Sequence, residues 1–352
     1  MSAGLAVTIE VTDTSAHARQ RHRSRRRAAL VIAALLVVLL GGSALSLSLG
    51  TGLSLPRLAS TLLGAGDAGD EFLLFRLQVP RILLAVVVGI AFGIAGALLQ
   101  AVARNPLASP DLLGISGGAS VGAVGTLLLL GASGPAVALG AFGGAAVAAT
   151  AIALLAWNQG ITGYRFVLIG IAIAFLANAV VNYLLTRAQV QQAQGALVWI
   201  VGSVAGANLA DVLLVVASFA ILLPLTVVLA PRLMLLQFGD DAARSWGVRA
   251  DATRIGGLAV SVALAAVGTA VAGPVAFVAF VSAPIARRLV GGELSLATSG
   301  LTGAALVVVA DLVGQHLLPG GLQVPVGIVT AAIGAPYLLG LLALSNRRGR
   351  GA

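Results

Sequence analysis

Long apolar stretches, separated by short polar or glycine- and proline-rich segments, make up most of this chain. A bilayer core about 30 Å thick needs roughly 20 apolar residues for one helical crossing, so each long stretch predicts a membrane-spanning helix. The pattern predicts ten such helices. They lie in residues 28–56 and 82–103, in 112–164 divided at 131–135, in 166–186 and 208–230, in 255–286 divided at Gly273 and Pro274, and in 295–318 and 325–345.

The predicted fold class is an all-α, multi-pass membrane protein with about ten transmembrane helices. Residues 1–27 are polar and basic without apolar periodicity, which indicates a disordered cytoplasmic tail. Residues 28–346 form one transmembrane domain, and residues 347–352 form a second short cytoplasmic tail. The stretch around Trp199, which follows a glutamine-rich patch, is predicted as an external half-helix or loop.

Composition supports a membrane protein and excludes much chemistry. Of 352 residues, 59% are hydrophobic and 9% charged, with a mean hydropathy of +1.04, so no water-soluble fold could bury the apolar surface. The chain has no lysine and no cysteine, which excludes a phosphate-binding loop of the GxxxxGK type, a Schiff base and a thiolate metal site. We therefore expect no enzyme activity, cofactor or metal in this chain, and any energy from ATP must come through a partner.

The arginines give an independent test of the topology. The net charge of +9 comes from arginines placed between apolar runs, which indicates membrane orientation and not nucleic-acid binding. With the basic tail inside, ten spans place 17 of the 21 arginines in the cytoplasm, since only Arg57, Arg76, Arg81 and Arg187 fall outside. Both termini are therefore predicted in the cytoplasm. A cleaved signal peptide at residues 19–50 is the alternative, but the long uncharged run and the many later spans favour a membrane helix.

A motif-bearing turn connects the second and third predicted spans. Its prolines keep residues 104–111 from becoming helical, and Asp111 is predicted to cap the next helix. The segment from Gln100 to Ala119 resembles the LQ-x-x-x-RNPLA-x-P-x-LLG-x-S-x-GA signature of the FecCD permeases, the membrane subunits of ABC importers for iron-siderophore complexes, haem and cobalamin. A generic cytoplasmic turn is the alternative interpretation. The candidate residues of this signature turn are Arg104, Asn105, Pro106, Pro110, Asp111 and Gly114.

A second cytoplasmic segment, residues 238–247, is similar to the family's LG-x-x-x-A-x-x-LG loop, which implies short coupling helices seated on an ATPase subunit. Its acids favour a helix start, and its tryptophan offers an apolar side chain to a groove on another protein. A helix on the membrane surface is the alternative. The candidate coupling residues are Phe238, Gly239, Asp240, Asp241, Ala242, Arg244, Trp246 and Gly247.

Two later segments also resemble the family. Residues 272–291 are similar to AGPI-x-FVGLVAPHIARRLVG, although Ala283 and Pro284 stand where many relatives have Pro-His. Residues 310–315 and 322–337 are similar to AD-x-x-x-R and ELPVG-x-x-TA-x-x-GAP-x-F. The resemblance therefore covers nearly the whole chain beyond the tail.

Arg76 and Arg81, before the second span, resemble the family's RLPR segment, which implies docking of an extracytoplasmic binding protein; interfacial anchoring is the alternative. Within the fifth span, Asn178 and Asn182 share a helix face, with Tyr183 and Thr186 near its external end. These four are candidates for a translocation path, and hydrogen bonding between helices is the alternative. For Asp311, in the ninth span, we expect a structural role.

The resemblance implies a cobalamin-importer-like permease fold in the bacterial cytoplasmic membrane. It implies a second permease subunit of the same chain or a paralogue, two cytoplasmic ATPase subunits that use ATP and Mg, and an extracytoplasmic binding protein. The expected cargo is a ferric siderophore, with cobalamin or haem as the alternative. From another class, a transporter driven by an ion gradient would need a coupling carboxylate in the membrane, and Asp311 is the acid well inside a span.

Overall fold

The computed structural model describes residues 14–111, 114–156 and 163–349, and every regular element among them is a helix. Short π-helical stretches follow α3 and α13, and a 3₁₀ turn precedes α14. The helices are α1 (Thr14–Thr51), α2 (Leu55–Leu62), α3 (Ala68–Glu71), α4 (Val79–Ala103), α5 (Ile115–Leu129), α6 (Pro135–Ala156), α7 (Gly163–Arg187), α8 (Val190–Val201), α9 (Leu209–Leu236), α10 (Asp240–Ser245), α11 (Ala250–Ala272), α12 (Val278–Val290), α13 (Leu296–Leu312) and α14 (Val326–Gly349).

Each of the ten predicted spans contains a helix, which confirms the all-α, multi-pass architecture. Within the described residues, seven helices are long and apolar enough to cross a bilayer, and α5 and α14 supply shorter apolar helices. Helices α5 and α12 are short members of this set of ten. These have 15 and 13 residues, so at 1.5 Å per residue neither reaches about 30 Å. Both begin after a residue with a left-handed backbone, Gly114 and Phe277 respectively.

Three local predictions meet different outcomes. The half-helix around Trp199 is confirmed as α8, and the break at Gly273 is confirmed by a φ of 69° there. The expectation of a disordered tail over residues 1–27 is wrong from Thr14 onward, because α1 begins at that residue and continues into the first span. The rest of the predicted tail lies outside the described residues.

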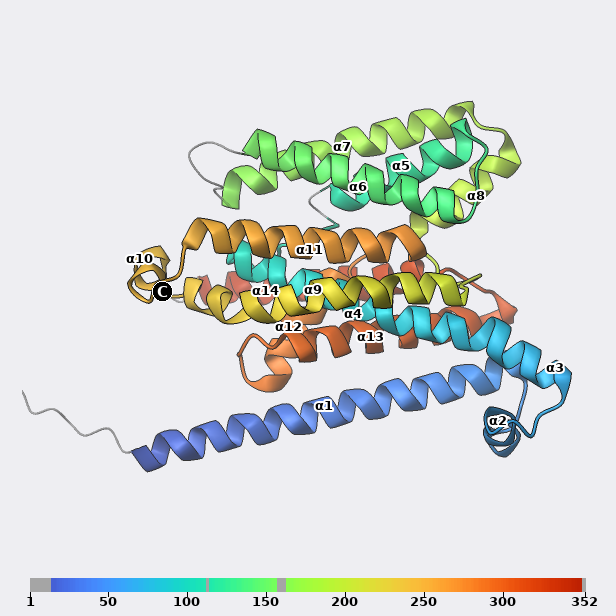
Figure 1. Cartoon of the computed structure of the whole chain (residues 1–352), viewed down its shortest axis with the longest axis horizontal. Helices are drawn as coiled ribbons and strands as arrows, with labels where there is room; N and C mark the ends of the chain where they lie inside the picture. Colours follow the sequence, from blue (N-terminus) through green and yellow to red (C-terminus); the bar gives the residue numbers. More distant parts are fainter. Residues whose placement is uncertain (1–13, 112–113, 157–162, 350–352) are drawn as a thin grey trace, which may run out of the picture.

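Helix α4 forms the centre of the molecule and packs against α9, α11, α12 and α13. Glycines allow the closest of these approaches: a Cβ at Gly89 would lie 2.5 Å from the Cα of Ala304, so α4 and α13 meet backbone to backbone. Helices α5, α6 and α7 form a separate group that contacts the core through α11. Figure 1 shows this group along the top and α1 along the bottom.

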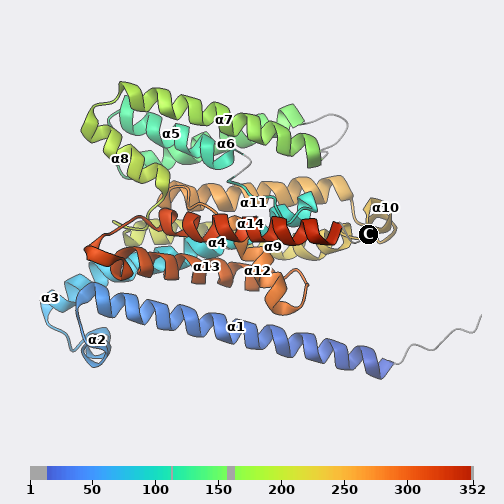
Figure 2. The ribbon, with the colours of Figure 1, turned by 180° about the vertical axis from the view of Figure 1, so that it is seen from behind.

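The long helices run lengthwise, so the molecule has two distinct ends. The first turn of α1, helix α10 and the end of α14 lie at one end, which we call the coupling end (Figures 1 and 2). Helices α2, α3 and α8 lie at the opposite end. The segments predicted in the cytoplasm therefore gather at a single end of the fold.

Candidate coupling surface and transport path

Helix α10 is a short helix between α9 and α11 at the coupling end. Gly239 precedes it with a φ of 110°, and Gly247 follows it with a φ of 78°, backbone conformations that favour glycine. Asp240 and Asp241 lie in its first turn, where the partial positive charge of the helix N-terminus favours acidic side chains. The two glycines thus place a compact helical turn between two long helices.

Two aromatic rings flank α10 and are open to the outside of the chain. Phe238 is 73% exposed and Trp246 is 56% exposed. Their ring centroids lie 5.9 Å apart in an edge-to-face arrangement. We call this pair the aromatic knob. A paired apolar surface of this kind fits a groove on another protein better than it fits water.

Asp240 ties α10 to two other helices. Its Oδ1 accepts a hydrogen bond from Nη2 of Arg254 on α11 at 2.6 Å, and a second from Nη2 of Arg104 at the end of α4. Arg104 itself adopts a left-handed backbone with a φ of 51°, which ends α4. We call these three residues the charge clamp. Through it the predicted coupling loop and the predicted signature turn, 136 residues apart in sequence, are in direct contact.

The charge clamp also fixes the protonation state of Asp240. Its partial burial favours the neutral acid and by itself raises the pKa, but the hydrogen bonds and positive charges of Arg254 and Arg104 together outweigh burial. The pKa of Asp240 therefore lies below the ordinary value of 3.8. The neighbouring Asp241 lies in a different setting, since its side chain is fully exposed and, among the described residues, pairs with Arg244 alone at 3.4 Å.

The signature turn is held by hydrogen bonds of its own. Oδ1 of Asn105 accepts from the Leu107 N–H at 2.9 Å, and the Asn105 N–H donates to the Gln100 carbonyl at 3.2 Å. Pro106 and Pro110, which lack an N–H group, sit in this non-helical stretch as the sequence predicts. The turn ends at Gly114, where a Cβ would lie 2.7 Å from the backbone of α7 at Gly170 and Ala174.

Asp111 does not cap α5, so that prediction is wrong. Gly114 occupies the N-cap position, and no side chain caps the helix. The carboxylate of Asp111 instead accepts a hydrogen bond from Ser116 Oγ at 2.9 Å and one from the backbone N–H of Phe277, at the start of α12. Asp111 therefore joins the signature turn to two short helices that begin inside the molecule.

A cavity of about 440 Å³ lies beside Asp111. Its polar lining comes from Asp111, Ser116 and Ser120, together with Asn178 on α7, and the ends of α8 and α14 contribute apolar residues. Polar groups inside a membrane protein usually face a cavity or a partner. Of the four predicted path residues, Asn178 lines this cavity.

Three helix breaks meet next to the cavity. The Ser203 N–H donates to the Ala272 carbonyl at 2.7 Å, and the Gly327 N–H donates to the Gly202 carbonyl at 3.2 Å. A Cβ at Gly202 would lie 2.5 Å from the carbonyl oxygen of Pro274. The backbone segments after α8, after α11 and before α14 therefore cross in direct contact, which glycine makes sterically feasible.

The four predicted path residues lie on an open face of α7. Asn178, Asn182, Tyr183 and Thr186 are all exposed in the single chain. The Thr186 hydroxyl donates to the Tyr183 carbonyl at 2.8 Å, within the helix. Neither asparagine side chain hydrogen-bonds to another residue in the part of the chain that the structure describes. The alternative of hydrogen bonding to other helices of this chain thus finds no partner there.

Arg81 has an internal partner where the sequence suggested a contact with another protein. Its Nε and Nη2 donate to the two carboxylate oxygens of Asp311 at 2.8 and 2.7 Å, and both side chains are largely buried. This pair joins α4 to α13 and confirms the structural role expected for Asp311. A guanidinium held in this way is poorly placed to dock a binding protein. Arg76 is exposed and forms no ion pair with a described residue, so it remains the docking candidate.

One member of the charge clamp is absent from the sequence-based candidates. Arg254 follows Asp240 by 14 residues and lies in the second turn of α11, one residue before the predicted seventh span. Its only signal in the sequence is an arginine in the first turns of an apolar helix, which calls for a nearby acidic partner.

No group of three or more metal-ligating side chains occurs in residues 14–111, 114–156 and 163–349.

The fold and the site define a multi-pass membrane protein with an exposed aromatic pair at one end and a polar cavity among broken helices. Comparison with known proteins places it more narrowly. The chain belongs to the FecCD transport family, whose family model matches residues 32–344.

Relatives of known role agree with this assignment. The chain is 36% identical over 310 residues to the Fe(3+)-citrate import system permease protein YfmE of Bacillus subtilis (strain 168), covering 87% of this chain and 92% of the relative. It is 35% identical to the ferric enterobactin transport system permease protein FepG of Escherichia coli (strain K12), covering 84% and 90%. A solved metal-chelate type ABC transporter in an inward-facing conformation shares the fold, with a TM-score of 0.75, 24% identity and coverage of 90% and 99%.

Proposed function

We propose that this chain is the permease subunit of a bacterial ABC importer that moves a ferric siderophore across the cytoplasmic membrane. ATP hydrolysis, with Mg, takes place in separate ATPase subunits. The observation that carries the proposal is the aromatic knob beside the charge clamp, within a member of the FecCD family. This arrangement presents a binding surface to a partner and connects it directly to α4, the central helix.

The route from partner to path consists of physical contacts. A displacement of α10 moves Asp240, which is bonded to Arg254 on α11 and to Arg104 on α4. The turn after Arg104 leads to Asp111, which lines the cavity and is bonded to the start of α12. Closure of two ATPase subunits on ATP can therefore bias the helices around the cavity between two arrangements.

The assembly follows from the two ends of the fold. ATPase subunits bind the coupling end, so both termini face the cytoplasm. A binding protein docks at the opposite end, where Arg76 is exposed. A second permease subunit, the same chain or a paralogue, packs across α7. Asn178 and Asn182, whose side chains hydrogen-bond to no other described residue, then line a shared path.

The cargo is a chelated ferric ion. The two named relatives are permeases for Fe(3+)-citrate and ferric enterobactin, which favours an iron chelate over cobalamin or haem. The chelator supplies the iron ligands, so a path lined by amide and hydroxyl groups has no need of protein ligands for the metal. Uptake of cobalamin or haem in place of every ferric siderophore tested would reverse this choice.

A transporter driven by an ion gradient is the second class. It needs a membrane carboxylate that is free to change its charge. Asp311, which the sequence offered for this task, is held by both nitrogens of the Arg81 fork. The structure therefore favours an importer that takes its energy from a partner.

The test is uptake into liposomes that contain this chain, its second permease subunit and the ATPase, with the binding protein and labelled ferric siderophore outside. We expect uptake that requires ATP inside and is lost in Trp246→Ala, together with ATPase binding. Phe72→Ala removes a ring of similar exposure, 58%, from the opposite end and should retain ATPase binding. Uptake driven by an ion gradient without the ATPase would refute the proposal.

A further inference from the structure

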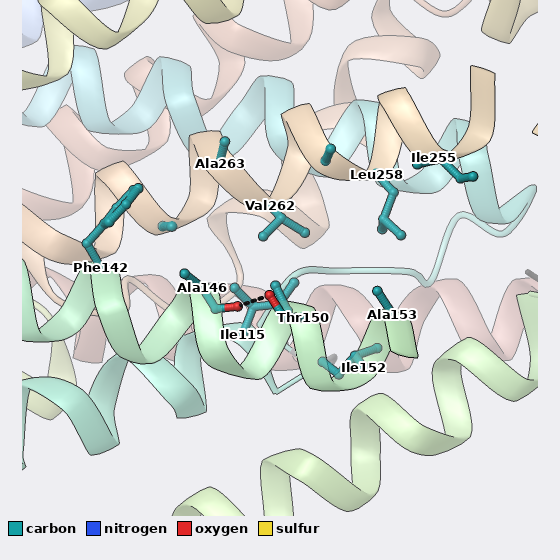
Figure 3. Close-up of a pocket in the computed structure, with 13 residues that line it drawn as sticks. Ile115, Phe142, Ala146, Thr150, Ile152, Ala153, Ile255, Leu258, Val262 and Ala263 are labelled. Atoms are coloured by element: carbon teal, nitrogen blue, oxygen red, sulfur yellow. Dashed lines mark hydrogen bonds between the residues drawn. The ribbon is translucent and has the colours of Figure 1, made fainter. Parts of the chain in front are cut away.

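An apolar groove with a volume of about 350 Å³ lies between α6 and α11. Figure 3 shows the labelled side chains of the two helices facing each other across it. Phe142 and Ala146 contribute from α6, and Val262 and Ala263 from α11. Small side chains on both helices create the groove, because alanine leaves the space that a larger residue would fill.

The lining of the groove offers no hydrogen-bond donor to a ligand. Thr150 is the polar side chain of its lining, and its hydroxyl already donates to the Ala146 carbonyl at 2.8 Å, the dashed line in Figure 3. Polar ligands are bound through a few well-placed polar groups, which this lining lacks. The occupant that fits is a hydrocarbon chain.

The length of the groove matches one leaflet of a bilayer. Its lining extends from Phe142 to Ala153 on α6 and from Ile255 to Ala266 on α11, which at 1.5 Å per residue is about 16 Å on each helix. This is close to half of a hydrocarbon core about 30 Å thick. Ile255 lies in the second turn of α11, so the groove starts near the coupling end.

A positive charge lies beyond the same end of the groove. Arg249 is exposed at the N-cap of α11, six residues before Ile255 and so about 9 Å along the helix. Arg249 forms no ion pair with any residue that the structure describes. The other charged groups here are occupied with each other, since Arg254 meets Asp240 at 2.6 Å and Asp251 at 4.0 Å. Arg249 is therefore free to attract an anionic headgroup.

We propose that the groove between α6 and α11 binds an acyl chain of an anionic phospholipid from the leaflet at the coupling end, with the headgroup at Arg249. The groove lies where the α5–α7 group meets the core through α11. A bound chain fills the contact between these two groups of helices. The proposal requires a membrane-embedded chain and does not depend on the cargo.

The test is native mass spectrometry of the purified full chain in detergent, titrated with dioleoyl-phosphatidylglycerol or with dioleoyl-phosphatidylcholine. The two probes share their acyl chains and differ in charge. We expect phosphatidylglycerol to bind about fivefold more tightly, the effect of one arginine near an anionic headgroup. Arg249→Gln should reduce its affinity to that of phosphatidylcholine, whereas Arg232→Gln, at another exposed arginine of the coupling end, should not.

A second pair of variants tests the groove itself. Ala146→Leu with Ala259→Leu fills it and should weaken both lipids, while Ala217→Leu, at an exposed alanine of α9, should weaken neither. Thermal melting shows whether the filled variant is folded. Equal affinity for the two lipids, or unchanged binding in a folded, filled variant, would overturn the proposal. Neither result would affect ATP-driven uptake, so failure here is distinct from failure of the proposed function.

Discussion

The charge clamp makes a specific prediction for the substitution Asp240→Asn. The asparagine has the size of the aspartate but no charge, so Arg254 and Arg104 lose the carboxylate between them, and Arg254 keeps only its 4.0 Å contact with Asp251 among the described residues. Both charged hydrogen bonds are partly exposed to solvent, so we assign each about 1 kcal/mol, between the values for surface ion pairs and for buried charged hydrogen bonds. Their loss costs about 2 kcal/mol.

This free energy is large relative to the other contacts that attach α10 to the rest of the molecule. The helix has six residues and one buried side chain, Ala243, and the segment around it has two exposed aromatic rings. A loss of about 2 kcal/mol changes the ratio of attached to detached α10 roughly 30-fold. We therefore expect Asp240→Asn to uncouple transport from ATP hydrolysis without unfolding the transmembrane core.

Hydrogen–deuterium exchange over residues 238–249 measures this change directly. The exchange of these amides should accelerate by up to about 30-fold in Asp240→Asn, while α4 and α13 remain protected. Asp241→Asn is the matched control, because its side chain is fully exposed and its contact with Arg244 is a weak surface pair. In reconstituted liposomes, the siderophore imported per ATP hydrolysed should fall in the first variant only. Equal exchange in the two variants would refute the reasoning.

Three further predictions follow from the same contacts. The pKa of Asp240 lies below 3.8, so the charge clamp stabilises α10 at any pH above that value and is lost only as the pH falls through the lowered pKa. The ratio of the exchange rates of Asp240→Asn and the wild type should therefore stay constant from about pH 8 to about pH 5. Arg81→Met should lower stability in thermal melts by about 3 to 5 kcal/mol, because it leaves Asp311 charged and buried. Adding Asp311→Leu should recover most of the lost stability. An unchanged melting temperature in the single variant would contradict this. Gly114→Ala should destabilise by at least about 1 kcal/mol, because φ is 72° and the Cβ meets α7, whereas Gly125→Ala, in open space, should be neutral or stabilising in the same melts.

The sequence predicts the helices well because a membrane imposes a simple rule on composition. Uncharged stretches of sufficient length located α1, α4, α5, α6, α7, α9, α11, α12, α13 and α14, and the glycine and proline at 273–274 located the break before α12. The length of an apolar stretch does not show at what depth in the membrane a helix begins. The shortness of α5 and α12 depends on backbone turns at Gly114 and Phe277, and a phenylalanine with a φ of 64° gives no signal in the sequence.

The site was predicted in part, for a related reason. Phe238 and Trp246 could be identified because their exposure follows from a polar loop between two spans. The pairs Arg81 with Asp311 and Arg104 with Asp240 join residues 230 and 136 positions apart, and only the packing of α4 against its neighbours brings them together. A charged residue near a span predicts that a partner exists, but it does not predict which one.

The account depends on the coupling end facing the compartment that contains ATP. The chain has no cysteine, so single cysteines can report this orientation without background labelling. Ser245→Cys lies at the end of α10 and Gln191→Cys lies at the start of α8, both exposed and at opposite ends of the molecule. We expect a membrane-impermeant maleimide to label Gln191→Cys in intact cells and to label Ser245→Cys only after the membrane is opened. Labelling of Ser245→Cys in intact cells would contradict the account.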